Sequence, residues 1–253
     1  MPSNPLRMAR HWGANLNIEN NMVLHNAGPK LKGHFSRLDH QGQAFYGRLA
    51  PHILPALSMH LPPGAHSTYF TDLNGNVSTS RFRPAPSVPK ASKGNQYSYL
   101  ELRPRFPLMG GWNYTFTLGW DSPLKDSAGY DAATGEYVVG IPVHTAIPGA
   151  VVDDATVKLI LPEGATHVQV YLPFDPLSEE KSTHITYLDT TGRPAVTYKF
   201  KNLTDRHTGL IYVKYQLPLS AHLAKPKAVA LAFSTLFALT FLLRRIDFRL
   251  VKA

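Results

Sequence analysis

An uninterrupted apolar run near the C-terminus constrains this chain more than any other feature. Residues 228–243 read AVALAFSTLFALTFLL and carry no charge. Their only polar side chains are Ser234, Thr235 and Thr240, and each hydroxyl can bond a backbone carbonyl within a helix. The run is apolar on every face, whereas an edge helix of a small soluble domain is amphipathic. We therefore interpret it as a membrane span rather than a buried C-terminal helix.

The length of the run sets the bounds of the predicted span. A spanning helix needs about 17–25 residues, so the sixteen of the run must be extended. Ile246 and Phe248 can extend it at one end, while Lys225 and Lys227 snorkel at the other. We place the single transmembrane helix at residues 226–246.

Charges beside the run predict its orientation. Arg244 and Arg245 follow it directly, and cations favour the cytosolic side. This predicts a luminal domain over residues 1–225 and a short cytosolic tail over residues 247–253. Residues 1–10 contain no apolar core of a signal peptide. We therefore expect either that the chain begins inside a longer precursor or that it is a truncated gene product.

Alternating apolar and polar residues predict a mainly β fold before the span. Strands are expected at residues 16–25, 67–71, 77–82, 97–102, 112–120, 156–161, 183–188, 195–200 and 210–217. Hairpin turns are expected at Asn74-Gly75 and at residues 189–192. One short helix is expected at residues 43–57, with long loops at 83–94 and 122–135. The spacing favours an antiparallel β-sandwich-like domain, and residues 83–95 are where it would divide if it is two units.

The basic character of the chain does not indicate nucleic-acid binding. The net charge is +9, but four cations less Asp247 give +3 within the last ten residues, and Lys225 and Lys227 add +2. The remaining chain contains no dense basic run and no aromatic-basic RNA-binding signature. We infer that nucleic acid is not a partner.

Motifs that would mark a catalyst are missing from the sequence. Cysteine is absent, and no HExxH, G-x-S-x-G, Walker A or G-x-G-x-x-G motif occurs. The spacings of the histidines match no metal-ligand pattern. We predict no catalytic residue, no metal and no cofactor.

Two sets of residues are candidates for other roles. Asn76, Asn113 and Asn202 each begin an Asn-X-Ser/Thr sequon and are candidate glycosylation sites. Ala230, Ser234 and Ala238 recur every four residues and would form a stripe of small side chains on the span. Such stripes let transmembrane helices pack closely, so we predict that this one packs against the helix of another subunit.

Several phrases of the sequence resemble the ribophorin I family over nearly the whole chain. The matching phrases are His11-Trp12-Gly13 and residues 31–39, 69–80, 101–112, 157–165 and 186–194. Within the fourth phrase, the two prolines of residues 103–107 exclude a central strand. We predict that this extended segment leads Gly110 and Gly111 into a tight turn before the Trp112 strand.

The resemblance implies a function that the residues alone do not. It implies a non-catalytic, single-pass type I subunit of the oligosaccharyltransferase of the endoplasmic reticulum, which stabilises the complex and presents substrates. Implied partners are the catalytic subunit, the other subunits, the membrane and nascent polypeptides. The alternative is an unrelated single-span adhesion or receptor-like β-sandwich ectodomain.

Overall fold

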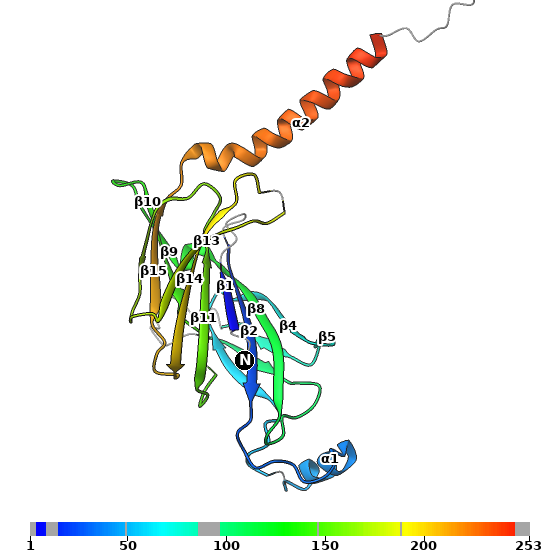
Figure 1. The fold of residues 1–253 in the computed structure, drawn as a ribbon. Coiled ribbons are helices and arrows are strands. Elements are labelled where there is room, and N and C mark those ends of the chain that lie inside the picture. The colour runs from blue at the N-terminus through cyan, green and yellow to red at the C-terminus, as the bar shows by residue number, and fades with distance from the viewer. Residues whose placement is uncertain are drawn as a thin grey trace, which may run out of the picture.

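The fold is described by a computed structural model that covers residues 4–8, 15–48, 50–85, 97–145, 147–187 and 189–245. In these residues β-strands dominate, and a single apolar helix follows them at the C-terminal end (Figure 1). The predicted mainly β class is confirmed. The expected tail over residues 247–253 and most of the expected loop over 83–94 lie outside the described residues.

The largest sheet runs through the whole β domain in the order β13-β14-β11-β1-β2-β8-β4-β5. Its strands are β1 (Asn4–Met8), β2 (Asn15–His25), β4 (His66–Asp72), β5 (Gly75–Asn76), β8 (Asn113–Pro123), β11 (Val152–Ile160), β13 (Ser178–His184) and β14 (Arg193–Leu203). Neighbouring strands are antiparallel with one exception, because β1 pairs in parallel with β11. The strand β1 therefore joins the early strands of the sheet to the late ones.

Two smaller sheets complete the domain. One has the order β12-β15-β10-β9 and the other β3-β7-β6. Their strands are β12 (Thr166–Tyr171), β15 (Leu210–Gln216), β10 (Glu136–Pro142), β9 (Ala128–Asp131), β3 (Leu57–Leu61), β7 (Ser98–Leu102) and β6 (Arg81–Arg83). Buried residues of all three sheets belong to one core, which includes Met59, Trp120, Tyr198 and Val213. Strict alternation of buried and exposed residues along β3 shows the sandwich pattern that the sequence predicts.

The domain has two distinct ends. Strand β11 runs toward the apolar helix and β14 runs away from it, because β14 begins at Arg193 beside the helix. By the pairing of β1 with both β11 and β2, the end of β2 at His25 and the start of β8 at Asn113 lie at the far end. The short helix α1 (Arg37–Phe45) lies at this far end too (Figure 1).

The predicted helix at residues 43–57 is wrong in position. Helix α1 starts earlier because the Ser36 side chain accepts a hydrogen bond from the Asp39 backbone N–H at its N-terminus. It ends at Phe45, and Gly47 follows with a φ of +66° that a continuing helix does not allow. Further along, Leu54 pairs with Leu108 as an isolated bridge.

Three other expectations need correction. The loop expected at 122–135 contains a 3-10 turn, η1 (Leu124–Asp126), and the strand β9. The strand expected at 77–82 is replaced by the short β5 and β6 on either side of a turn. The strand expected at 183–188 ends at His184, and Ile185 and Tyr187 are exposed. The strands β1, β3, β9, β10, β12 and most of β13 were not predicted.

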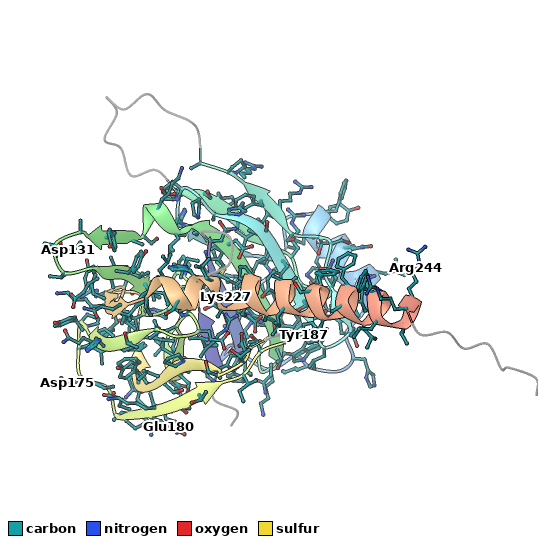
Figure 2. All side chains as sticks on the ribbon, turned by 90° about the horizontal axis from the view of Figure 1, so that it is seen from above. Asp131, Asp175, Glu180, Tyr187, Lys227 and Arg244 are labelled. Carbon is teal, nitrogen blue, oxygen red and sulfur yellow. The ribbon has the colours of Figure 1, made fainter. Side chains whose placement is uncertain are left out.

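The apolar helix α2 (Leu219–Arg245) leaves the β domain, and none of its residues is fully buried (Figures 1 and 2). Among the described residues it is the one helix long and apolar enough to cross a membrane. It begins seven residues before the expected span and contains Pro226. Proline removes one helical hydrogen bond and its ring crowds the carbonyl four residues earlier, so the helix bends near its base.

Candidate functional site: the junction between the β domain and the apolar helix

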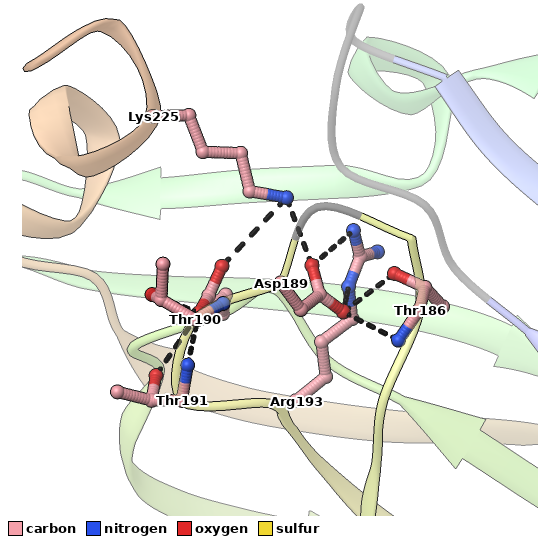
Figure 3. Close-up of polar contacts among 7 residues, drawn as sticks. Thr186, Asp189, Thr190, Thr191, Arg193 and Lys225 are labelled. Carbon is pink, nitrogen blue, oxygen red and sulfur yellow. Dashed lines mark hydrogen bonds and ion pairs between the residues drawn. The ribbon is translucent and has the colours of Figure 1, made fainter. Parts of the chain in front are cut away.

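A cluster of charged and hydroxyl side chains connects α2 to the β domain (Figure 3). It is formed by the loop that follows β11, which contains Glu163, and by the turn between β13 and β14, residues 185–192. Lys225 reaches both loops from the second turn of α2. We call Glu163, Asp189, Arg193 and Lys225 the junction cluster.

Asp189 is the centre of the junction cluster. Its side chain is fully buried, and the side chain of Arg193 is only 7% exposed. One carboxylate oxygen accepts hydrogen bonds from Arg193 Nε at 3.0 Å and from the backbone N–H and hydroxyl of Thr186. The other oxygen accepts from Arg193 Nη2 at 3.2 Å and from Lys225 Nζ at 2.8 Å. A buried carboxylate needs this many donors to stay ionised.

Glu163 holds the same turn from the other side. Its Oε1 accepts hydrogen bonds from the backbone N–H groups of Thr190 and Thr191, both at 2.7 Å, and from both hydroxyls. Its Oε2 lies 3.7 Å from Lys225 Nζ. Lys225 therefore ties α2 to both loops, and it points back to the domain rather than snorkelling as the sequence predicted.

The pKa values of both carboxyl groups follow from these contacts. Burial alone would raise the pKa of Asp189, but the bonds from Arg193, Lys225 and Thr186 outweigh it and hold the pKa well below its usual value. Burial likewise opposes ionisation of Glu163, and the four hydrogen bonds from Thr190 and Thr191 lower its pKa to about 2. Both groups are therefore charged at neutral pH.

Close backbone packing fixes the same contact. Gly164 has a φ of +81°, and a Cβ added there would lie 2.6 Å from the Cβ of Ala221. Ala221 and Lys225 are four residues apart, so both lie on the side of α2 that faces the domain. Leu219 and Leu223 lie on the opposite side of the helix and are exposed.

The predicted stripe on α2 is exposed along its whole length. Ala230, Ser234 and Ala238 have no neighbour from the β domain, since α2 buries no residue. The Ser234 hydroxyl donates to the Ala230 carbonyl at 2.8 Å. Thr235 and Thr240 donate to carbonyls within the helix in the same way, which confirms that the run satisfies its own polar groups.

The three sequons lie on the surface of the domain. Asn76 in β5, Asn113 at the start of β8 and Asn202 near the end of β14 are all exposed. Asn113 and Asn202 are at the end far from α2, and the Oδ1 of Asn113 lies 2.6 Å from His25 Nδ1. The structure does not bring the sequons together with one another or with the stripe.

The contacts of the junction cluster indicate what it does chemically. The oxygens of Asp189 and Glu163 are bonded to donors of the chain itself, so the cluster is arranged to hold backbone and helix in place. No group of three potential metal-binding side chains occurs within the described ranges. The junction cluster is not predicted from the sequence, although Asp189 and Arg193 lie within the family phrase at residues 186–194, because residues 189–192 indicate only a hairpin turn.

Comparisons with known proteins agree with the phrases in the sequence. The model of the family described as Ribophorin I matches residues 9–244. A rice (Oryza sativa subsp. japonica) protein named Dolichyl-diphosphooligosaccharide--protein glycosyltransferase subunit 1B is 34% identical over 216 residues, which is 85% of this chain and 43% of that protein. The Arabidopsis thaliana subunit 1A is 33% identical over 96% of this chain and 37% of its own length.

A relative outside plants also matches most of this chain. Subunit 1 of Caenorhabditis elegans is 32% identical over 94% of this chain and 38% of its own length. The chain thus spans less than half the length of these three curated relatives. The matched region includes both the junction cluster and most of α2.

Proposed function

This chain belongs to the ribophorin I family, and from that premise we propose that it is a non-catalytic, membrane-anchored subunit of the oligosaccharyltransferase complex. The observation that carries the proposal is that the family model matches the β domain and α2 together, and that relatives named as subunit 1 and 1A of the glycosyltransferase match 94–96% of this chain. The same match supports this function over that of an unrelated adhesion or receptor ectodomain. The partners are then the other subunits, including the catalytic one, and nascent polypeptides that the β domain helps to present.

The proposed location is the endoplasmic reticulum membrane, in a single-pass type I orientation. Residues 1–225 are luminal, 226–246 span the membrane and 247–253 form a cytosolic tail. The apolar surface of α2 supports the span, because its exposed Phe233, Leu236 and Phe237 would otherwise contact water. Arg244 and Arg245 in the last helical turn support the orientation.

Copurification tests membership of the complex. The tagged chain is extracted from microsomes in mild detergent, and the eluate is probed for the catalytic subunit. We expect the catalytic subunit to copurify in near-stoichiometric amount. An unrelated single-span protein of the same membrane, with the same tag, is the control. Equal recovery of the catalytic subunit with the control would refute the proposal.

The sequons test the luminal orientation. Asn76 is exposed beside a tight turn, so we propose that it carries a glycan, as do Asn113 and Asn202 where the transferase reaches them. Glycosidase treatment of protein from microsomes should raise its gel mobility, and Asn76→Gln should remove part of that shift. Unchanged mobility of the treated parent protein would contradict a luminal domain with used sequons.

The stripe on α2 is a proposed helix-packing surface. Replacing Ala230, Ser234 and Ala238 together with Leu preserves insertion but fills the groove between small side chains. We expect weaker assembly in detergent pull-downs. A matched control replaces Leu231, Leu239 and Leu242 with Ile, which keeps the bulk of another side of the helix. If the stripe variant assembles as fully as this control, the stripe is not an interface.

A further inference from the structure

The turn between β13 and β14 carries two apolar side chains that the domain does not cover. Ile185 is 73% exposed and Tyr187 is 90% exposed, although the same turn buries Asp189 completely. The backbone N–H and the hydroxyl of Thr186 donate to the Asp189 carboxylate, and these bonds hold the chain in a turn directly after β13 ends at His184. The exposure is therefore fixed by the fold of the turn.

The base of α2 also carries exposed apolar side chains. Ala221 and Lys225 face the domain, so Leu219 and Leu223 face away from it, 73% and 42% exposed. These first turns are amphipathic, unlike the apolar run of residues 228–243. The two elements that the Asp189–Lys225 contact joins thus carry two exposed apolar side chains each.

The junction cluster sets the depth of this surface relative to the span. Lys225, which bonds Asp189 at 2.8 Å, stands three residues before the apolar run that starts at Ala228. At about 1.5 Å per residue this is roughly 5 Å along the helix. Each headgroup layer of a bilayer is of the same order, about 5–8 Å thick. Figure 1 shows α2 leaning over the β domain, and in the view from above in Figure 2 Tyr187 lies close to the line along which the helix runs.

We infer that Ile185, Tyr187, Leu219 and Leu223 form a second membrane contact, which inserts into the lipid headgroup layer beside the span. The inference rests on the proposed membrane span. Tyrosine is enriched at that depth because its ring is apolar and its hydroxyl stays hydrated. With the helix and the turn both held by lipid, the domain has two attachment points and a fixed tilt.

Spin-label accessibility in the full chain tests the inference, and the chain is suited to it because it contains no cysteine. Tyr187→Cys is labelled and the protein is reconstituted into phosphatidylcholine vesicles. Leu239→Cys marks the span, and Lys201→Cys marks the far end of β14, where the side chain is exposed. Collisions with oxygen, which partitions into lipid, are compared with collisions with a water-soluble nickel complex.

The expected ratio of oxygen to nickel collisions rises from position 201 to 187 to 239. Equal ratios at 187 and 201 would overturn the inference and leave the span intact. A label at 187 that neither reagent reaches would show cover by protein, which also overturns it. A water-like ratio at 239 would instead show that the span itself is wrong, and the lipid contact would fall with it.

Discussion

Two turns at opposite ends of the β domain are held by different kinds of force. The turn beside α2 is held by the junction cluster, in which Asp189 is a buried charge and Glu163 a partly buried one. The turn at the far end, Gly110-Gly111, is held by neutral contacts. There Asn26 donates to the carbonyls of His52 and Leu108 at 2.7 and 3.0 Å.

Close packing accounts for the rest of the far turn. Gly111 N–H donates to the Asn26 carbonyl at 2.7 Å, and Gly111 has a φ of +77°. A Cβ added to Gly110 would lie 1.9 Å from the Pro29 carbonyl oxygen. The far turn is therefore sensitive to added volume, whereas the turn beside α2 is sensitive to charge and pH. Both belong to phrases by which the sequence resembles its family.

The largest effect is expected from Gly110→Val. The new side chain would collide with backbone, so the far turn must rearrange, at a cost of more than about 4 kcal/mol. Urea unfolding in mild detergent measures it, followed by the fluorescence of Trp120, which is 1% exposed. Gly129→Val is the matched control, since a Cβ at this strand position meets nothing within 4 Å. Equal midpoints for the two variants would refute the packing argument.

Asp189→Ala should have the next largest effect. It leaves the guanidinium of Arg193 buried without its carboxylate, which costs roughly 3–5 kcal/mol. The same urea titration applies. Glu179→Ala provides the control, because it removes an exposed pair with Lys181 at 3.7 Å and should change stability by less than about 1 kcal/mol. A loss for Asp189→Ala no larger than for this control would mean that the cluster contributes little.

Asn26→Ala tests the uncharged hydrogen bonds that hold the far turn. It leaves two carbonyls without a donor at a site that is 8% exposed, and we expect a loss of about 1–3 kcal/mol. This loss should be the same in low and high salt, because no charge is removed. A salt-dependent loss would show that the far turn is not held by neutral contacts alone.

The smallest effect is expected from moderate acid. The pKa of Glu163 is about 2 in the folded chain against an ordinary value of 4.5, so its contribution is complete above pH 4.5 and is lost as the pH falls toward 2. By pH 3.5 the loss is about 1 kcal/mol. Hydrogen exchange of the first turns of α2 should report it. In Glu163→Gln this pH dependence should shrink, and an unchanged profile would contradict the assignment.

The sequence predicted these two turns unequally. The turn before Trp112 and the hairpin turn at residues 189–192 are both expected from glycine and proline positions, which act locally. The structure shows a positive φ at Gly111 and at Gly192. The contact of Asp189 with α2 was not expected, because Lys225 is 36 residues away and pairing at that distance has no local signal. The predicted strand at 183–188 begins five residues after the true start of β13 at Ser178. The residues of β13 are exposed on both faces and show no alternation, so the sequence does not mark its start.

Strands that pack on one face were predicted well because apolar and polar residues alternate along them. In β15, Ile211, Val213 and Tyr215 alternate with exposed residues, and burial follows that period. Helix α1 was misplaced because it buries no residue, so apolar periodicity carried no information about it. The apolar helix α2 was the clearest feature, since its composition alone separates it from the domain.

The position of β1 bears on how the chain folds as it is synthesised. Asn4 pairs with Ala155, so about 150 further residues must be synthesised before one edge of β1 can pair with β11. At about 5–20 residues per second, synthesis leaves that edge open for roughly 8–30 seconds. An open strand edge is a site for wrong pairing. Chaperones that cover early strand edges should therefore matter more for this chain than for a sandwich built only from hairpins.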